Sequence, residues 1–209
     1  MPKLTTDQIV AIDKALWDIE IRFLDIRIEM IDHAATSLEG MKGDFDANLE
    51  RYIAINKGGL KKSYRRFSRN ASLNGVKLLF SNMFTFRFII ILAAVYTILF
   101  GDYKYEGYEE VSTRLLIPFV LAMPAFWVYI GYKNFTQQKK LFSTAERLFY
   151  SLSGVGYLLC VPVYLQVEKL ELSSELKLLY SAFVISFVLL LAYTYRSLTK
   201  MYSSRYQVA

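Results

Sequence analysis

Four long apolar segments in the second half of the chain constrain its fold more than any other feature. Each is bounded by charged residues and offers about 20 residues, the length of helix that crosses the hydrocarbon core of a bilayer. The only charged residue inside them is Arg87. The sequence therefore predicts an all-α protein with a four-helix transmembrane bundle over residues 78–209. The bounding pairs are Lys77 and Asp102, Arg114 and Lys133, Arg147 and Glu168, and Lys177 and Arg196.

The charges of the connecting loops alternate in sign and predict the orientation of the bundle. Acidic residues outnumber basic ones in loops 101–113 and 168–177, whereas loop 133–147 and the short tail after Arg196 are mainly basic. Because Lys and Arg are retained on the cytoplasmic side, both termini should be cytoplasmic. We expect a bacterial inner (plasma) membrane protein whose first span directs insertion, since no cleavable signal peptide is visible.

A basic segment, residues 57–77, precedes the first apolar segment, and we call it the basic collar. Leu60, Tyr64 and Phe67 recur at helical spacing, so the basic collar should be an amphipathic helix on the membrane surface. Its charge suits anionic lipid headgroups better than nucleic acid, because residues 1–40 hold eight acidic residues against four Lys and Arg. The residues expected at the membrane surface are Lys57, Lys61, Lys62, Arg65, Arg66 and Arg69.

Residues 1–56, which we call the head, carry the pattern of a small cytoplasmic helical module. Thr5 and Gln8 have the spacing of a capping box at the start of a first helix. One interpretation continues that helix through Met30 as a heptad-like seam. The other, which we prefer, ends it near Asp18, because the alternation of residues 19–23 is typical of an extended chain.

The rest of the head predicts two further helices. Asp25 is a good N-cap for a second helix that ends at Gly40. Asp44 should cap a third helix, and the pair Gly58-Gly59 should end it. A hydrophobic core of this size gives only marginal stability alone, so we expect the head to pack against the membrane, a partner or a second copy of the chain.

The most distinctive short stretch of the head lies in the second predicted helix. Its charged residues suggest a surface that binds a cytoplasmic protein partner. Glu29 and His33 at i,i+4 could also supply half of a metal site, but the other ligands are missing, and Cys160 is the only cysteine. We therefore expect no metal. The candidate partner-binding residues are Asp25, Arg27, Glu29, Asp32 and His33.

Arg27 and His33 have a second interpretation. Five residues separate them, a spacing similar to the catalytic Arg and His of HEPN ribonucleases. That resemblance implies that the two residues come together across a dimer of helical domains to cleave RNA. A membrane-anchored ribonuclease is thus an alternative function, with Arg27 and His33 as its catalytic candidates.

The whole N-terminal region has a resemblance of its own. The run from Asp25 to His33, within a helical module followed by membrane helices, resembles the HAAS-type regulatory regions of bacterial multi-pass membrane proteins. The resemblance centres on residues 25–39 and implies a protein-interaction and signalling module. The layout is also similar to the accessory membrane proteins of type VI-B CRISPR systems.

Inside the apolar segments the informative residues are prolines and glycines. None of these segments contains Asp, Glu, His or Lys, which argues against an ion-coupled carrier. Proline and glycine loosen a membrane helix or allow close packing between helices, so they predict either a hinge or pore lining, or a packing contact. These positions are Pro118, Pro124, Gly154, Gly156 and Pro162.

The sequence shows no glycine-rich phosphate loop, nucleophile elbow or zinc-protease helix, so we expect neither enzyme activity nor a cofactor. The pattern favours a non-enzymatic membrane regulator or effector that self-associates. Its head would bind a partner, and its bundle would respond, for example by opening a pore. A small-solute transporter or an assembly subunit of a membrane complex is the remaining alternative.

Overall fold

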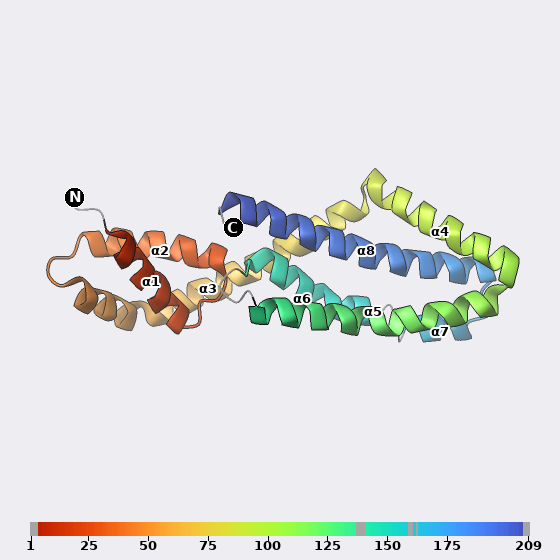
Figure 1. Cartoon of the computed structure of the whole chain (residues 1–209), viewed down its shortest axis with the longest axis horizontal. Helices are drawn as coiled ribbons and strands as arrows, with labels where there is room; N and C mark the ends of the chain where they lie inside the picture. The colour runs from red at the N-terminus through yellow and green to blue at the C-terminus, as the bar shows by residue number, and fades with distance from the viewer. Residues whose placement is uncertain (1–3, 137–140, 159–160, 162, 207–209) are drawn as a thin grey trace.

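The computed structural model describes residues 4–136, 141–158, 161 and 163–206, and its regular secondary structure there is helical throughout. This confirms the predicted all-α class. The molecule is elongated, with the head at one end and the helices of the apolar half packed lengthwise at the other (Figure 1).

The head begins with two short helices, α1 (Thr6–Asp18) and α2 (Leu24–Glu39), and α1 runs obliquely to α2 in this view (Figure 1). The predicted capping box at Thr5 and the predicted break after Asp18 are both confirmed. The prediction that Asp25 caps its own helix is wrong, because Phe23 is the N-cap and Asp25 lies in the first turn. The apolar residues of both helices share one buried cluster, which contains Ile12, Leu16, Ile21, Ile26, Met30 and Ala34.

A single helix, α3 (Phe45–Met83), then runs the length of the head and into the bundle. The Asp44 carboxylate caps it by accepting the Ala47 N–H at 3.0 Å, as predicted. The prediction that a helix ends at Gly58-Gly59 is wrong. Neither glycine has a positive φ, and the apolar residues on both sides of the pair are packed, so the helix continues through it. The basic collar is therefore the middle of α3.

The described residues after α3 form four long helices and the short helix α7. Among the described residues, α4 and α8 are the two helices long and apolar enough to cross a membrane. The second predicted span lies within α5. The third begins in α6, and its residues 159, 160 and 162 lie outside the described set. The bounds are α4 Phe86–Glu106, α5 Tyr108–Thr136, α6 Ser143–Leu158, α7 Tyr164–Lys169 and α8 Ser174–Arg205.

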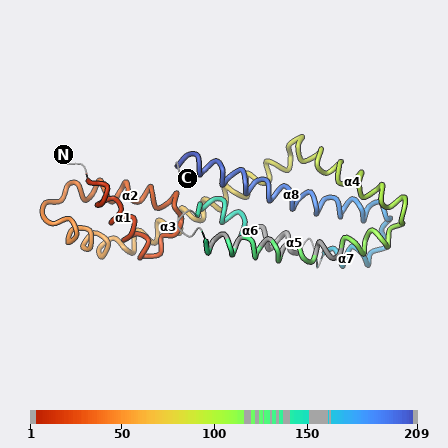
Figure 2. Tube along the Cα trace, in the orientation of Figure 1, coloured from red at the N-terminus to blue at the C-terminus, as the bar shows by residue number. Residues whose placement is uncertain are grey.

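The two acidic segments, 101–113 and 168–177, meet at the end of the molecule farthest from the head (Figure 2). The prediction that 101–113 is a loop is wrong, because α4 extends to Glu106 and α5 begins at Tyr108. Gly107 makes the α4–α5 turn there with a φ of 84°, which favours glycine. The Tyr108 hydroxyl donates to the Glu168 carboxylate, and Lys177 Nζ donates to the Glu168 carbonyl at 2.8 Å. Acidic segments thus occupy one end of the long axis, and the basic collar lies toward the other.

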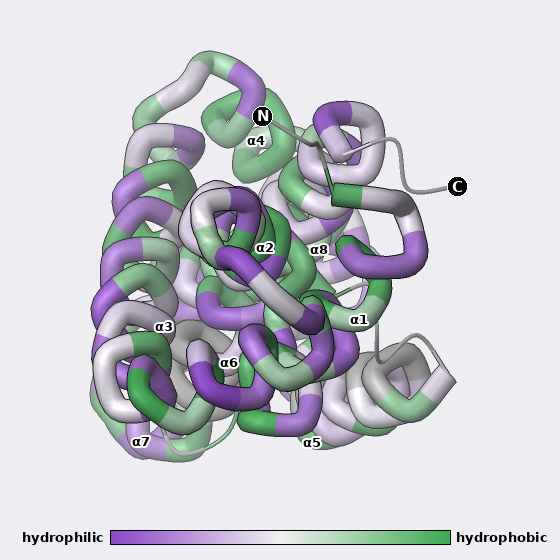
Figure 3. Tube along the Cα trace, turned by 90° about the vertical axis from the view of Figure 1, so that its left-hand side faces the viewer, coloured by the Kyte–Doolittle hydropathy of each residue, from purple (hydrophilic) through white to green (hydrophobic). Residues whose placement is uncertain are grey.

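The bundle core forms where α3 crosses α6 and α8. Leu79, Leu148 and Leu191 are fully buried there. Gly75 permits the crossing, because a Cβ at this position would lie 2.9 Å from the Leu148 Cβ. Seen from the head end, hydrophilic and hydrophobic residues alternate along α3 at the left, whereas α4, near the top of the view, is mostly hydrophobic (Figure 3).

Candidate functional site

The starts of two helices, α2 in the head and α6 in the bundle, meet end to end. The Leu24 N–H donates to the Leu141 carbonyl at 2.8 Å. In the other direction, the Asp25 carboxylate accepts the Ser143 N–H at 3.0 Å and the Ser143 hydroxyl at 2.5 Å. Asp25 is 7% exposed. It therefore caps a helix that starts 118 residues later in the chain, and we call this contact the head–bundle joint.

A second contact beside the head–bundle joint involves Arg147 of α6. Its Nε donates to the Ser68 hydroxyl on α3 at 2.7 Å. Its guanidinium group also lies 5.6 Å from the ring centroid of Phe23, which belongs to the α1–α2 linker. The Phe23 ring in turn packs on Tyr64 of α3 at 5.7 Å. One arginine thus connects the bundle to both the head and α3.

The end of α8 joins the same region through aromatic rings. Phe142 stacks on Tyr202 and Tyr206, with centroid distances of 5.5 and 6.3 Å. The hydroxyl groups of Tyr202 and Thr144 are 2.8 Å apart. A polar cavity of about 290 Å³ lies at this point and includes Glu29 among its lining residues. Movement of the head relative to the bundle would therefore disturb α3, α6 and α8 together.

Arg27, a predicted site residue, is part of the interior of the head. Its side chain is 2% exposed. Its Nε donates to Asp13, and its Nη1 donates to the carbonyls of Ile21 and Arg22 at 3.4 and 3.2 Å. The guanidinium group therefore holds the α1–α2 linker in place. His33 is exposed, so the structure does not bring Arg27 and His33 together within one chain.

The other predicted partner-binding residues of α2 separate into two groups. Asp25 faces inward to the head–bundle joint, whereas Glu29, Asp32 and His33 are exposed. A search of the described residues finds no group of three His, Cys, Asp or Glu arranged to hold a metal ion. The exposed three remain a predicted surface for a partner.

The basic collar is mostly exposed along α3. Lys61 differs from the other members because it forms an ion pair. Its Nζ lies 2.8 Å from the Glu20 carboxylate of the α1–α2 linker. This hydrogen bond and the charge of Lys61 lower the pKa of Glu20. Lys61 therefore connects the basic collar to the head. The exposed members are Lys57, Lys62, Arg65, Arg66 and Arg69.

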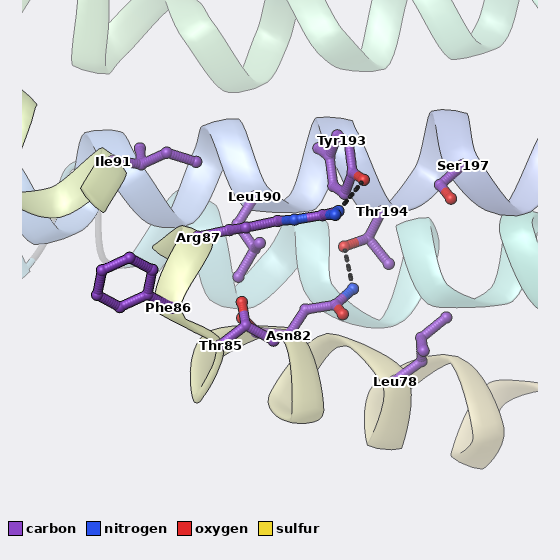
Figure 4. A pocket seen from close by; sticks show the side chains of 10 residues that line it. All are labelled: Leu78, Asn82, Thr85, Phe86, Arg87, Ile91, Leu190, Tyr193, Thr194 and Ser197. Carbon is purple, nitrogen blue, oxygen red and sulfur yellow. Dashed lines mark hydrogen bonds between the residues drawn. The ribbon is translucent and has the colours of Figure 1, made fainter. Parts of the chain in front are cut away.

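A groove of about 530 Å³ lies where α3 ends and α4 begins, against α8 (Figure 4). Arg87 Nη1 donates to the Tyr193 hydroxyl at 3.2 Å, and Asn82 Nδ2 donates to the Thr194 hydroxyl at 3.1 Å. These polar groups point toward one another across the groove. They attach the α3–α4 turn to α8.

The predicted hinge or packing residues lie in continuous helices where they are described. α5 is one helix through Pro118 and Pro124, and Gly154 and Gly156 lie within α6. Pro162 lies outside the described residues.

Sequence reasoning missed the start of α6. It assigned Ser143 and Glu146 to a loop, yet Glu146 is 1% exposed and accepts the Tyr195 hydroxyl at 3.0 Å. The spacing of Ser143 and Glu146 is that of a capping box before an apolar run, so a signal for this helix start was present. Nothing local indicated that Asp25 would be its cap.

Comparison with protein-family models, curated proteins and solved structures finds no match for this chain. The resemblances to HAAS-type regions and to CRISPR accessory proteins therefore stay predictions.

Proposed function

We propose that this protein is a non-enzymatic membrane regulator in which the head controls the packing of the membrane helices. The observation that carries the proposal is the head–bundle joint, where buried Asp25 of the head caps α6 of the bundle. A partner bound to the exposed face of α2 would act on the same helix. Such binding shifts the equilibrium between two packings of the bundle only if the partner binds more tightly to one of them than to the other.

The proposal includes four crossings of a bacterial inner membrane with both termini cytoplasmic. α4 and α8 are the candidate first and last spans. The second would be α5, which has no charged residue over 115–132, and the third would be the segment 148–167, which also has none. The alternation of acidic and basic loops supports this topology.

Continuous α3 supplies the path from head to spans. It begins against the head core, crosses α6 at Gly75 and ends at the α3–α4 turn. There Asn82 bonds to Thr194 of α8. A rotation or shift of α3 would therefore reach the first and last spans at once. The expected response is a change in helix packing within an oligomer, which can open a pore.

The proposal is tested with Asp25→Ala in purified protein reconstituted into dye-loaded vesicles. Loss of the cap removes two hydrogen bonds at a buried helix start, which costs about 1–2 kcal/mol. We expect dye release to change at least several-fold, together with the pattern of chemically crosslinked oligomers. The matched control is Asp32→Ala, because Asp32 is an exposed aspartate on the same helix.

Circular dichroism checks that both variants remain helical. If Asp25→Ala and Asp32→Ala vesicles both leak at the wild-type rate, and their crosslinks are the same, the joint does not control the bundle.

The burial of Arg27 favours this function over RNA cleavage. A catalytic arginine must reach the scissile phosphate, whereas this guanidinium group is enclosed and bound to Asp13. Regulation through α2 requires no such access.

A further inference from the structure

A basic cleft lies between α3 and α6, beside the head–bundle joint. It has a volume of about 450 Å³. Arg65 and Arg69 line it from consecutive turns of α3, and Arg147 lines it from α6. Three guanidinium groups from two helices thus face one cavity. The remaining lining residues are polar or aromatic: Tyr64, Ser68, Ser72 and Tyr150.

In the described part of the chain, no ion pair is found for the three arginines of the cleft. None of the seven lining residues is acidic. The ion pairs found among the described residues involve other cations, namely Arg27, Lys61 and Arg114. Three like charges held near one another repel, so their arrangement favours an anion between them.

The cleft is also held in a fixed shape. Arg147 is oriented by its hydrogen bond to Ser68 and by its contact with the Phe23 ring. The crossing at Gly75, seven residues beyond Ser68, sets the separation of the two helices. Burial raises the pKa of the Tyr64 hydroxyl, and a backbone hydrogen bond with Arg22 opposes this shift. Preorganised donors bind an anion with less loss of side-chain entropy.

We propose that this cleft binds the phosphate group of an anionic phospholipid. Arginine forks match phosphate oxygens in a bidentate geometry, and serine hydroxyl groups supply further donors. The lipid source is favoured because apolar side chains are exposed next to the cleft. Leu73, which follows Ser72 on α3, is 60% exposed, and Phe80 two turns later is 52% exposed. Acyl chains would lie along this surface.

This inference rests on the proposed membrane location but not on the proposed coupling of head and bundle. It also differs from general attraction of the basic collar to a charged surface. Lys62 and Arg66 are equally basic and exposed on α3, yet they do not line the cleft. Comparing changes at Arg65 and Arg69 with changes at Lys62 and Arg66 therefore distinguishes binding at a defined site from attraction by diffuse charge.

The test measures the apparent melting temperature of the full chain in detergent micelles with three added probes. These are dioctanoyl phosphatidic acid, dioctanoyl phosphatidylcholine and inorganic phosphate. A ligand that binds only the folded protein raises its melting temperature as its concentration rises. We expect phosphatidic acid to raise it for wild type, and the other two probes to have little effect at equal concentration.

The test variant is R65Q together with R69Q, and the matched control is K62Q together with R66Q. Both remove two charges from exposed positions of α3. We expect the apparent affinity for phosphatidic acid to fall about ten-fold or more in the test variant, and to stay within about two-fold of wild type in the control.

Three outcomes would overturn the proposal. An equal loss in both variants would assign binding to diffuse charge, and the absence of any shift in wild type would exclude the site. An equal rise in melting temperature with inorganic phosphate would show that the cleft binds a soluble phosphate rather than a phospholipid. None of these measurements uses a partner or vesicle leakage. A negative result would therefore count against the lipid site without bearing on the proposed coupling of head and bundle.

Discussion

Gly75 shows how one side chain controls the contact between α3 and α6. A Cβ there would lie 2.9 Å from the Leu148 Cβ and 3.2 Å from the Thr144 carbonyl oxygen. Both neighbours belong to the same helix, and Leu148 is fully buried, so neither has space to retreat. By contrast, a Cβ at Gly59 on the same helix α3 would meet nothing within 4 Å.

We therefore expect Gly75→Ala and Gly59→Ala to change stability in opposite directions. Overpacking at Gly75 should cost about 1–3 kcal/mol. Alanine at Gly59 should stabilise by about 0.5–1 kcal/mol, because glycine is unfavourable in a helix interior. Thermal unfolding in detergent, followed by circular dichroism, measures both. Equal melting temperatures for the two variants would contradict the close crossing at Gly75.

At the scale of elements, the continuity of α3 decides how the head is connected to the bundle. A helix that ended at Gly58-Gly59 would leave a flexible link between them, and movement of the head would not be transmitted. The 39-residue helix Phe45–Met83 instead packs on the head at its start and on α6 and α8 near its end. Helix ends depend on what packs on each side, so two exposed glycines do not suffice to stop one.

Spin labels at Glu50→Cys and Lys77→Cys, with Cys160→Ala as background, test this continuity. The two positions are 27 residues apart, and a straight helix separates their backbones by about 40 Å. We expect a single narrow distance distribution. A matched pair on glycine-free α8, Glu175→Cys and Arg196→Cys, gives the reference width. A broad or double distribution in α3 alone would mean that the helix bends at the glycines.

At the scale of the whole molecule, the acidic segments 101–113 and 168–177 and the basic collar lie at different places along the long axis. Glu106 at the end of α4 and Glu168 in α7 belong to the end far from the head, whereas the basic collar in the middle of α3 lies nearer the head (Figure 1). In a membrane this arrangement would favour a single orientation, because Lys and Arg of the basic collar resist translocation.

A membrane-impermeant maleimide tests the orientation in the same Cys160→Ala background. We expect intact cells to be labelled at Glu171→Cys in the far loop, and to be labelled at Asp46→Cys in the head only after the membrane is broken. Both positions are exposed, so access is limited by the membrane alone. Labelling of the Asp46→Cys variant in intact cells would reverse the proposed topology.

The sequence by itself determined the helical class, the cap of α1 at Thr5, the cap of α3 at Asp44 and the break after Asp18. These features depend on residues within one or two turns of each other, so local spacing is enough to predict them.

Only the tertiary structure decided that Arg27 is enclosed, that α3 passes through Gly58-Gly59, and that Asp25 caps α6 rather than its own helix. Asp25 and Ser143 are separated by 118 residues, and no local pattern encodes which carboxylate meets which helix start. That pairing follows from the packing of the head against the bundle, where a buried N–H must find an acceptor and a buried carboxylate must find donors.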